Sequence, residues 1–192
     1  MMEAACKVFS ERGYANTTMG AVAEEARVAV QTLYFTFHTK ADLLQAAYEH
    51  AVLGPDFTPP HLTEWWRTAE AETDIVVAVD VLVRGTLELF ARAAPLVWSV
   101  RGDADAGPSY ELNEQLRRDG YAAIVAFLAE KHPLRPHLDE RTARDLLLAI
   151  LGPHMYIVLT RELEWPSENV ARWMTRSVLH ELFGVEVDPD PI

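Results

Sequence analysis

The chain has 192 residues, of which 49% are hydrophobic and 24% charged, a composition typical of a globular protein and not of a disordered one. Its formal net charge of −12 at pH 7 argues against a protein that coats nucleic acid through bulk positive charge. The single cysteine, Cys6, excludes a disulfide framework and a cysteine-rich zinc site, and the lack of a run of about 18 uncharged apolar residues predicts no membrane span.

Apolar residues recur at helical spacing along the whole chain, whereas alternating strand patterns are nearly absent, so the predicted fold is all-α. We expect a first helix that Gly13 ends, followed by helices at about 19–26, 30–37 and 40–53. Pro55, Pro59 and Pro60 then predict a boundary, because proline cannot continue a helix. This boundary separates a small domain at 1–53 from a larger helical domain at 54–192.

In the larger domain the pattern predicts helices at about 62–70, 73–93, 109–131, 139–163 and 167–183. The acidic charge lies mainly in this part. Residues 1–52 carry four basic and six acidic side chains, while the remainder carries 13 basic and 23 acidic ones. A nearly neutral head on an acidic body therefore remains compatible with local nucleic-acid binding.

Residues 13–44 contain the pattern that bears most directly on function. Short helices at 19–26 and 30–37, joined by a tight turn at 27–29, predict a helix-turn-helix. Leu33 and Phe37 would pack inward, and the outward face would carry Val30, Gln31, Thr32, Tyr34 and Phe35. An outward face with an amide, a hydroxyl and a phenol suits a DNA major groove, where base edges offer donors, acceptors and methyl groups.

The same segment carries a series of residues whose order and spacing match a known family. They are Gly13, Tyr14, Thr17, Thr18, Val22, Ala23, Ala26, Val28, Thr32, Leu33, Tyr34, Phe37, Lys40, Leu43 and Leu44. The segment resembles the N-terminal DNA-binding domain of the TetR family of bacterial transcriptional regulators. More loosely, the length, the helical pattern and the Glu-Trp-Pro-Ser turn at 164–167 resemble the family's ligand-binding and dimerisation domain.

The resemblance implies a set of DNA contacts. Thr18, Tyr34 and Lys40 would touch phosphates, which position the helix, and the outward residues of helix 30–37 would face bases or sugars. The expected DNA-binding residues are Thr17, Thr18, Arg27, Val30, Gln31, Thr32, Tyr34, Phe35 and Lys40.

Three features depart from the family pattern. Arg27 replaces the turn glycine, so it either occupies a left-handed position at a cost of about 1 kcal/mol or forms another turn and reaches a phosphate. Ala29 replaces the usual serine or threonine cap, so a capping bond worth about 1 kcal/mol is expected to be absent. The basic arm and first turn that usually precede the first helix have no counterpart, which a numbering that begins late, a misassigned start codon or weak DNA binding would explain.

The larger domain offers candidates for a ligand site and a dimer interface. Its aromatic residues either pack in the core or line a cavity for a flat, apolar or aromatic inducer, and the candidates are Trp66, Phe90, Trp98, Tyr110 and Phe127. Helices 139–163, with a kink at Pro153, and 167–183 carry apolar stripes that either form an intramolecular core or pair across a two-fold axis. The expected interface residues are Ile150, His154, Ile157, Trp165, Trp173, Val178 and Leu179.

The resemblance implies a ligand-responsive transcriptional regulator, most often a repressor in the family. As a homodimer it would bind a pseudo-palindromic operator and be released by a small-molecule inducer. The alternative is a helical small-molecule-binding or protein-interaction module that has lost DNA binding. No nucleophile–base or metal-binding pattern occurs, so we expect neither an enzyme nor a cofactor or metal. The start lacks a signal peptide, so the expected location is the cytoplasm, without a membrane partner.

Overall fold

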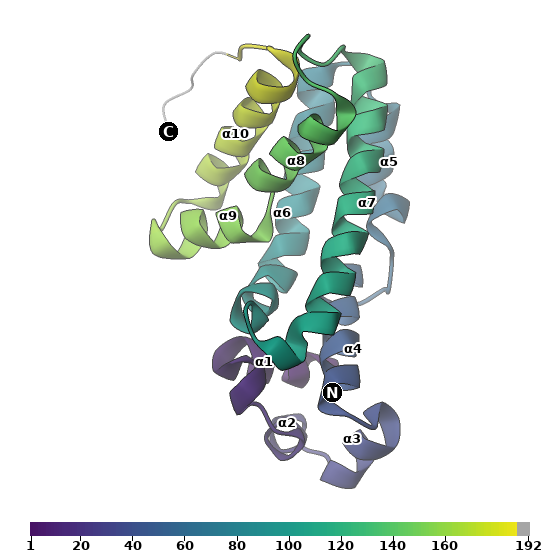
Figure 1. Ribbon diagram of the computed structural model, residues 1–192, viewed down its shortest axis with the longest axis vertical. Helices are drawn as coiled ribbons and strands as arrows, with labels where there is room; N and C mark the ends of the chain where they lie inside the picture. Colours follow the sequence, from purple (N-terminus) through teal and green to yellow (C-terminus); the bar gives the residue numbers. More distant parts are fainter. Residues whose placement is uncertain (188–192) are drawn as a thin grey trace. The chain divides into compact units, whose positions relative to one another are not determined.

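The computed structural model describes residues 1–187, and within them it contains helices, turns and loops but no strand (Figure 1). The predicted all-α fold is therefore confirmed. The chain divides into two compact units. We call Met1–Thr58 together with Ala91–Gln115 the N-terminal unit, and Pro59–Phe90 together with the residues from Leu116 onward the C-terminal unit.

Two long helices, α6 (Ile75–Val100) and α7 (Gly107–Lys131), contribute to both units. The last turns of α6, the short helix η2 (Ala104–Ala106) and the first turns of α7 belong to the N-terminal unit, although the sequence pattern placed them in the larger domain. The predicted functional boundary between residues 53 and 54 stays a prediction, since contacts within a chain do not show which part functions alone.

The N-terminal unit begins with four helices whose ends have identifiable causes. They are α1 (Met2–Asn16), α2 (Met19–Ala26), α3 (Val30–Phe37) and α4 (Lys40–Leu53). Gly13 interrupts α1 with a φ of 73°, and a Cβ at this position would lie 3.2 Å from the backbone oxygen of Ser99. The hydroxyl of Thr18 caps α2 by accepting the N–H of Ala21, and Thr39 and Asp42 cap α4 reciprocally.

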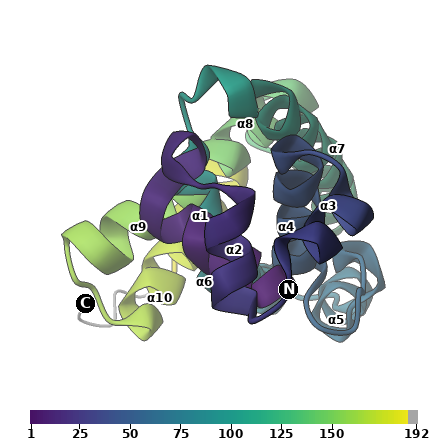
Figure 2. The ribbon, with the colours of Figure 1, turned by 90° about the horizontal axis from the view of Figure 1, so that it is seen from below.

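The four helices pack around one apolar core. Figure 2 shows α2 lying against α1, and α3 lying against α4. α6 continues through Pro95 because Leu96 and Val100, which follow it, are buried in this core. The fully or largely buried members are Ala5, Val8, Phe9, Tyr14, Met19, Val22, Ala23, Leu33, Leu43, Leu44, Ala47, Tyr48, Leu96, Val100 and Ala106.

The C-terminal unit is also helical. After η1 (Pro60–Leu62) come α5 (Glu64–Ala71), α8 (Glu140–Ile150), α9 (Pro153–Ile157), η3 (Val158–Glu162), α10 (Ser167–Val178) and η4 (Leu179–Phe183). α5 packs on α6, where the ring of Trp65 covers Gly85, and on α7, where Trp66 meets Phe127 edge-on. Buried residues of α8 and α10 complete the core.

The stretch predicted as one helix at 139–163 is divided in the structure. α8 ends at Ile150, and Gly152 with Pro153 separates it from α9 because proline lacks the N–H that would continue the ladder. By length and composition alone, Glu140–Glu162 could cross a membrane. The break and the burial of Ala143, Leu147 and Leu151 within the unit instead describe a packed helical segment.

Candidate nucleic-acid interface

α2 and α3 are joined by a three-residue turn that begins at Arg27. Arg27 has φ 55° and ψ 42°, which is the left-handed region, and its N–H donates to the carbonyl of Glu24 at 3.1 Å. Of the two arrangements that the sequence left open for this turn, the structure therefore adopts the left-handed one. A side chain there costs about 1 kcal/mol relative to glycine. The side chain of Arg27 is exposed at the start of the turn, close in sequence to the first residues of α3.

α3 turns one apolar edge inward and a polar, aromatic face outward. Leu33 is buried and Phe37 is half-buried, whereas Tyr34 is 51% exposed and Phe35 is 85% exposed. Gln31 and Thr32 are also exposed, and Val30 is half-buried. Ala29 forms no side-chain capping bond at the start of α3, because a methyl group cannot accept a hydrogen bond.

Two exposed residues on this surface were not among the sequence candidates. Thr36 lies on the last turn of α3, and its hydroxyl donates to the carbonyl of Thr32 at 2.9 Å. His38 follows α3 with a φ of 50°, and its Nδ1 lies 3.2 Å from the carbonyl oxygen of Tyr34. The position of His38 directly after a predicted recognition helix was the signal that could have identified it.

The candidate phosphate-contact residues fall into two groups. Thr18 is exposed at the start of α2, where its hydroxyl oxygen accepts an N–H and its proton can still be donated. Thr17, in contrast, is 1% exposed, and its hydroxyl donates to the carbonyl of Gly13 at 2.7 Å. The expectation that Thr17 contacts DNA is therefore corrected, because its side chain is buried in the unit.

Lys40 has partners inside the N-terminal unit. Its Nζ donates to the carbonyl of Tyr14 at 2.8 Å and lies 4.1 Å from the centre of the Tyr14 ring. The half-buried side chain thereby joins the start of α4 to the end of α1. In this geometry Lys40 contacts other parts of the same unit, whereas the family resemblance implied a contact with a DNA phosphate.

A second basic residue of the unit is held by an acidic one. Lys7 on α1 forms an ion pair with Glu25 on α2 at 2.8 Å, and both side chains are exposed. The mutual hydrogen bond raises the pKa of Lys7 and lowers the pKa of Glu25. Arg12 and Arg27 are the other two basic residues in positions 1–53, and both are exposed, so positive charge on the surface of the first four helices is sparse.

The comparisons with known proteins agree with this geometry. Residues 1–47 match the family model of bacterial regulatory proteins, tetR family. The chain carries the N-terminal domain of the TetR family. No curated protein sequence is significantly similar to the chain.

Solved TetR-like structures extend the similarity in fold to the whole chain. The fatty acid degradation regulator FadR from Bacillus halodurans is 17% identical with a TM-score of 0.74, over 93% of this chain and 95% of that one. FadR from Bacillus subtilis, solved in complex with stearoyl-CoA, is 15% identical with a TM-score of 0.73, over 96% and 97%. NalD from Pseudomonas aeruginosa, the secondary repressor of the MexAB-OprM multidrug efflux pump, is 17% identical with a TM-score of 0.70, over 95% and 94%.

The candidate ligand residues are distributed over both units. Trp66, Phe90 and Phe127 are buried in the C-terminal unit, and Trp98 and Tyr110 belong to the N-terminal unit. Trp66 and Phe127 contact each other with ring centres 5.7 Å apart, whereas Phe90 contacts Tyr156. Ligand contact by these five residues stays a prediction, because ring-to-ring packing accounts for the burial of the three in the C-terminal unit.

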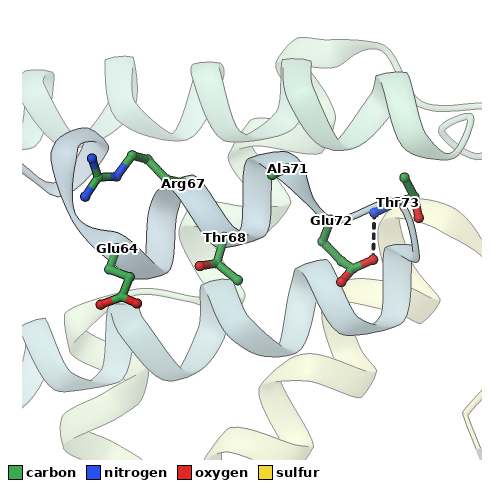
Figure 3. Close-up of a pocket in the computed structure, with 6 residues that line it drawn as sticks. All are labelled: Glu64, Arg67, Thr68, Ala71, Glu72 and Thr73. Carbon is green, nitrogen blue, oxygen red and sulfur yellow. Dashed lines mark hydrogen bonds between the residues drawn. The ribbon is translucent and has the colours of Figure 1, made fainter.

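A cavity of about 580 Å³ borders α5 in the C-terminal unit (Figure 3). Its lining comes from α5 and the residues after it, and five of the six lining residues are polar or charged: Glu64, Arg67, Thr68, Ala71, Glu72 and Thr73. None of the five candidate ligand residues lines it. Within residues 1–187, no group of three or more His, Cys, Asp or Glu side chains could hold a metal ion.

The candidate interface residues divide by burial. Ile157, Val178 and Leu179 are buried in the protomer core, so they cannot lie on a surface between two copies, and this expectation is corrected. Ile150, His154, Trp165 and Trp173 are half-buried, with the rings of Trp165 and Trp173 edge-to-face at 6.4 Å. Leu163, which the sequence analysis did not include, is 56% exposed beside them in the chain.

Proposed function

We propose that the chain is a ligand-responsive transcriptional repressor that binds a pseudo-palindromic operator as a homodimer. The observation that carries this proposal is the outward face of α3, which presents an amide, a phenol and an exposed phenyl ring in a tetR-family domain. Such a face has no role in the core of the unit. It does suit insertion into a major groove, where side chains meet base edges.

Phosphate contacts would come from the two sides of this helix. Thr18 at the start of α2 combines an exposed hydroxyl with the positive end of a helix dipole, which favours an anion. Tyr34 and Arg27 are exposed on and beside α3. Since the unit offers few cations, we expect a weak salt dependence in comparison with strongly basic DNA-binding proteins.

Two copies would pair through α8 and α10, as the half-buried aromatic and aliphatic residues on this part of the chain suggest. The candidates that remain accessible are Ile150, His154, Trp165 and Trp173. Aromatic residues at the surface are typical of interface cores. A two-fold dimer would present two copies of α3 to successive major grooves.

An apolar or aromatic small molecule would release the repressor from DNA. The fold is similar to that of a regulator solved with stearoyl-CoA, whose acyl chain is apolar, and this similarity supports a ligand of apolar character. A ligand that lowers DNA affinity 100-fold needs about 2.7 kcal/mol of preference for the released conformer. Such a regulator would act in the cytoplasm, and the proposal requires neither a cofactor nor an enzymatic step.

The proposal is tested by selection of the full chain against a random double-stranded DNA library, followed by affinity measurements at several salt concentrations. We expect a two-fold symmetric motif, and a loss of affinity of tenfold or more in Tyr34→Ala and Thr18→Ala. Light scattering should report a dimer, which Trp173→Glu should convert to a monomer. A folded dimer that enriches no sequence would overturn the proposal and favour a helical binding module without DNA recognition.

A further inference from the structure

We infer that α3 selects A·T base pairs, with the amide of Gln31 on adenine and the ring of Phe35 against the methyl group of thymine. This inference rests on the proposed function, because it specifies what the DNA-binding surface recognises. It concerns the sequence preference of each half-site, which neither the fold nor the family match assigns.

The first observation is that α3 carries no charged side chain. Its sequence from Val30 to Phe37 is Val-Gln-Thr-Leu-Tyr-Phe-Thr-Phe. Arginine and lysine are the usual partners of guanine, through O6 and N7, and acidic side chains accept from cytosine. A recognition helix without either type lacks the strong contacts that select G·C pairs.

The exposed polar groups of α3 either favour adenine or have no preference between the base pairs. Gln31 is exposed, and its amide can donate to N7 and accept from N6 of adenine at the same time. The hydroxyl proton of Thr36 already bonds the carbonyl of Thr32, so it is not available to a guanine acceptor. Hydroxyl groups such as those of Thr32 and Tyr34 bond either base pair and add no preference.

Phe35 supplies the apolar contact. At 85% exposure it is the most exposed of the large hydrophobic side chains in residues 1–187, ahead of Leu116 at 59% and Phe57 at 58%. A phenyl ring on a major-groove helix has one specific partner on the base edges, which is the C5 methyl group of thymine. Burying this ring against a methyl group would remove apolar surface from water, which stabilises a complex.

Gln31 and Phe35 are placed to act together. They are separated by four residues, so they lie on the same side of α3, about 6 Å apart along its axis. Adjacent base pairs are stacked about 3.4 Å apart. The two side chains can therefore reach neighbouring base pairs in one groove, and the preferred step contains an adenine and a thymine.

The test begins with the motif selected by the full chain and replaces each thymine of the half-site with deoxyuridine, which lacks only the methyl group. We expect the wild-type chain to lose affinity roughly fourfold for each contacted methyl. Phe35→Ala should lose a similar factor on the thymine duplex and be insensitive to deoxyuridine. Phe57→Ala, which removes an exposed phenyl ring outside α3, is the matched control and should respond to deoxyuridine like the wild type.

Gln31→Ala gives a second, independent result. It should lower discrimination against a G·C replacement at one half-site position by roughly tenfold, while Thr36→Ala should not change it. Circular dichroism should show all four variants folded, because the four side chains are exposed.

The outcomes separate this inference from the function on which it rests. If no sequence is enriched, both fail. A selected motif whose contacted positions are G·C would overturn the inference and leave the repressor intact. The inference would also be contradicted if Phe35→Ala lost the same factor relative to the wild type on the deoxyuridine duplex as on the thymine duplex, since the ring would then act on sugars or stacked bases instead of the methyl group.

Discussion

The two units differ in where they place the side chains that the sequence singles out. In the N-terminal unit, Gln31, Tyr34 and Phe35 lie on the surface, where packing gives no reason for them. In the C-terminal unit, the aromatic candidates Trp66 and Phe127 are buried against each other, and packing alone explains them. A sequence pattern therefore indicates function most strongly when folding does not require it.

The largest expected effect tests the packing of the C-terminal unit. A Cβ on Gly85 of α6 would lie 2.2 Å from Cδ2 of Trp65 on α5, so Gly85→Ala must displace the indole ring. We expect the free energy of unfolding to fall by about 2–3 kcal/mol, measured by urea denaturation. DNA affinity per folded molecule should be unchanged if the surface of α3 alone determines it.

The chain provides a matched control for this substitution. Gly120 lies inside α7 with no atom within 4 Å of its ideal Cβ, so Gly120→Ala should stabilise by about 0.5–1 kcal/mol through helix propensity. In a Trp65→Ala background, Gly85→Ala should also become stabilising. A large loss that persists without the indole ring would show that Trp65 is not its cause.

The next effect concerns Lys40 in the N-terminal unit. Lys40→Met keeps most of the aliphatic stem but removes the bond to the carbonyl of Tyr14, so we expect a loss of about 1–2 kcal/mol in the free energy of unfolding. The slope of log affinity against log salt should stay near the wild-type value, since this lysine is used within the protein. A slope reduced by about one per protomer at unchanged stability would instead assign Lys40 to a phosphate.

The sequence predicted three of the four N-terminal helices with the observed bounds, because caps and turns mark their ends locally. It did not predict that α6 continues through Pro95, since that depends on the burial of Leu96 and Val100 in a core formed by distant segments. The sequence analysis also included Thr17 among the residues expected to contact DNA. Thr17 and its neighbour Thr18 are chemically alike, and only the path of the backbone after Gly13 buries one and exposes the other.

Substitutions at Arg27 can distinguish an effect on the stability of the fold from an effect on DNA binding. Arg27→Gly relieves a left-handed side chain, so the free energy of unfolding should rise by about 1 kcal/mol. If the guanidinium reaches a phosphate, the salt slope should fall by about one per protomer. Arg27→Gln removes the same charge without relieving the backbone, so it should reproduce the change in slope but not the gain in stability.

The smallest expected effects compare one exposed ion pair from each unit. Glu168 of α10 accepts from both Nη atoms of Arg84 at 2.8 and 2.9 Å, while Glu25 accepts one bond from Lys7 at 2.8 Å. These hydrogen bonds hold the pKa of each carboxyl below its ordinary value of 4.5. Each pair therefore stabilises the fold above about pH 4.5, and the contribution is lost as the pH falls through the lower pKa of the folded state.

Glu168→Gln should accordingly lower the urea midpoint at pH 7 by a small amount, and the difference from the wild type should shrink as the pH falls below about 4.5. Glu25→Gln should show the same pH dependence with a smaller amplitude, because one flexible lysine replaces a two-point arginine contact. Raising the salt concentration should reduce both differences. If Glu25→Gln has the larger effect, the Lys7–Glu25 pair contributes more than a surface contact, and the joining of α1 to α2 would depend on charge as well as on the core.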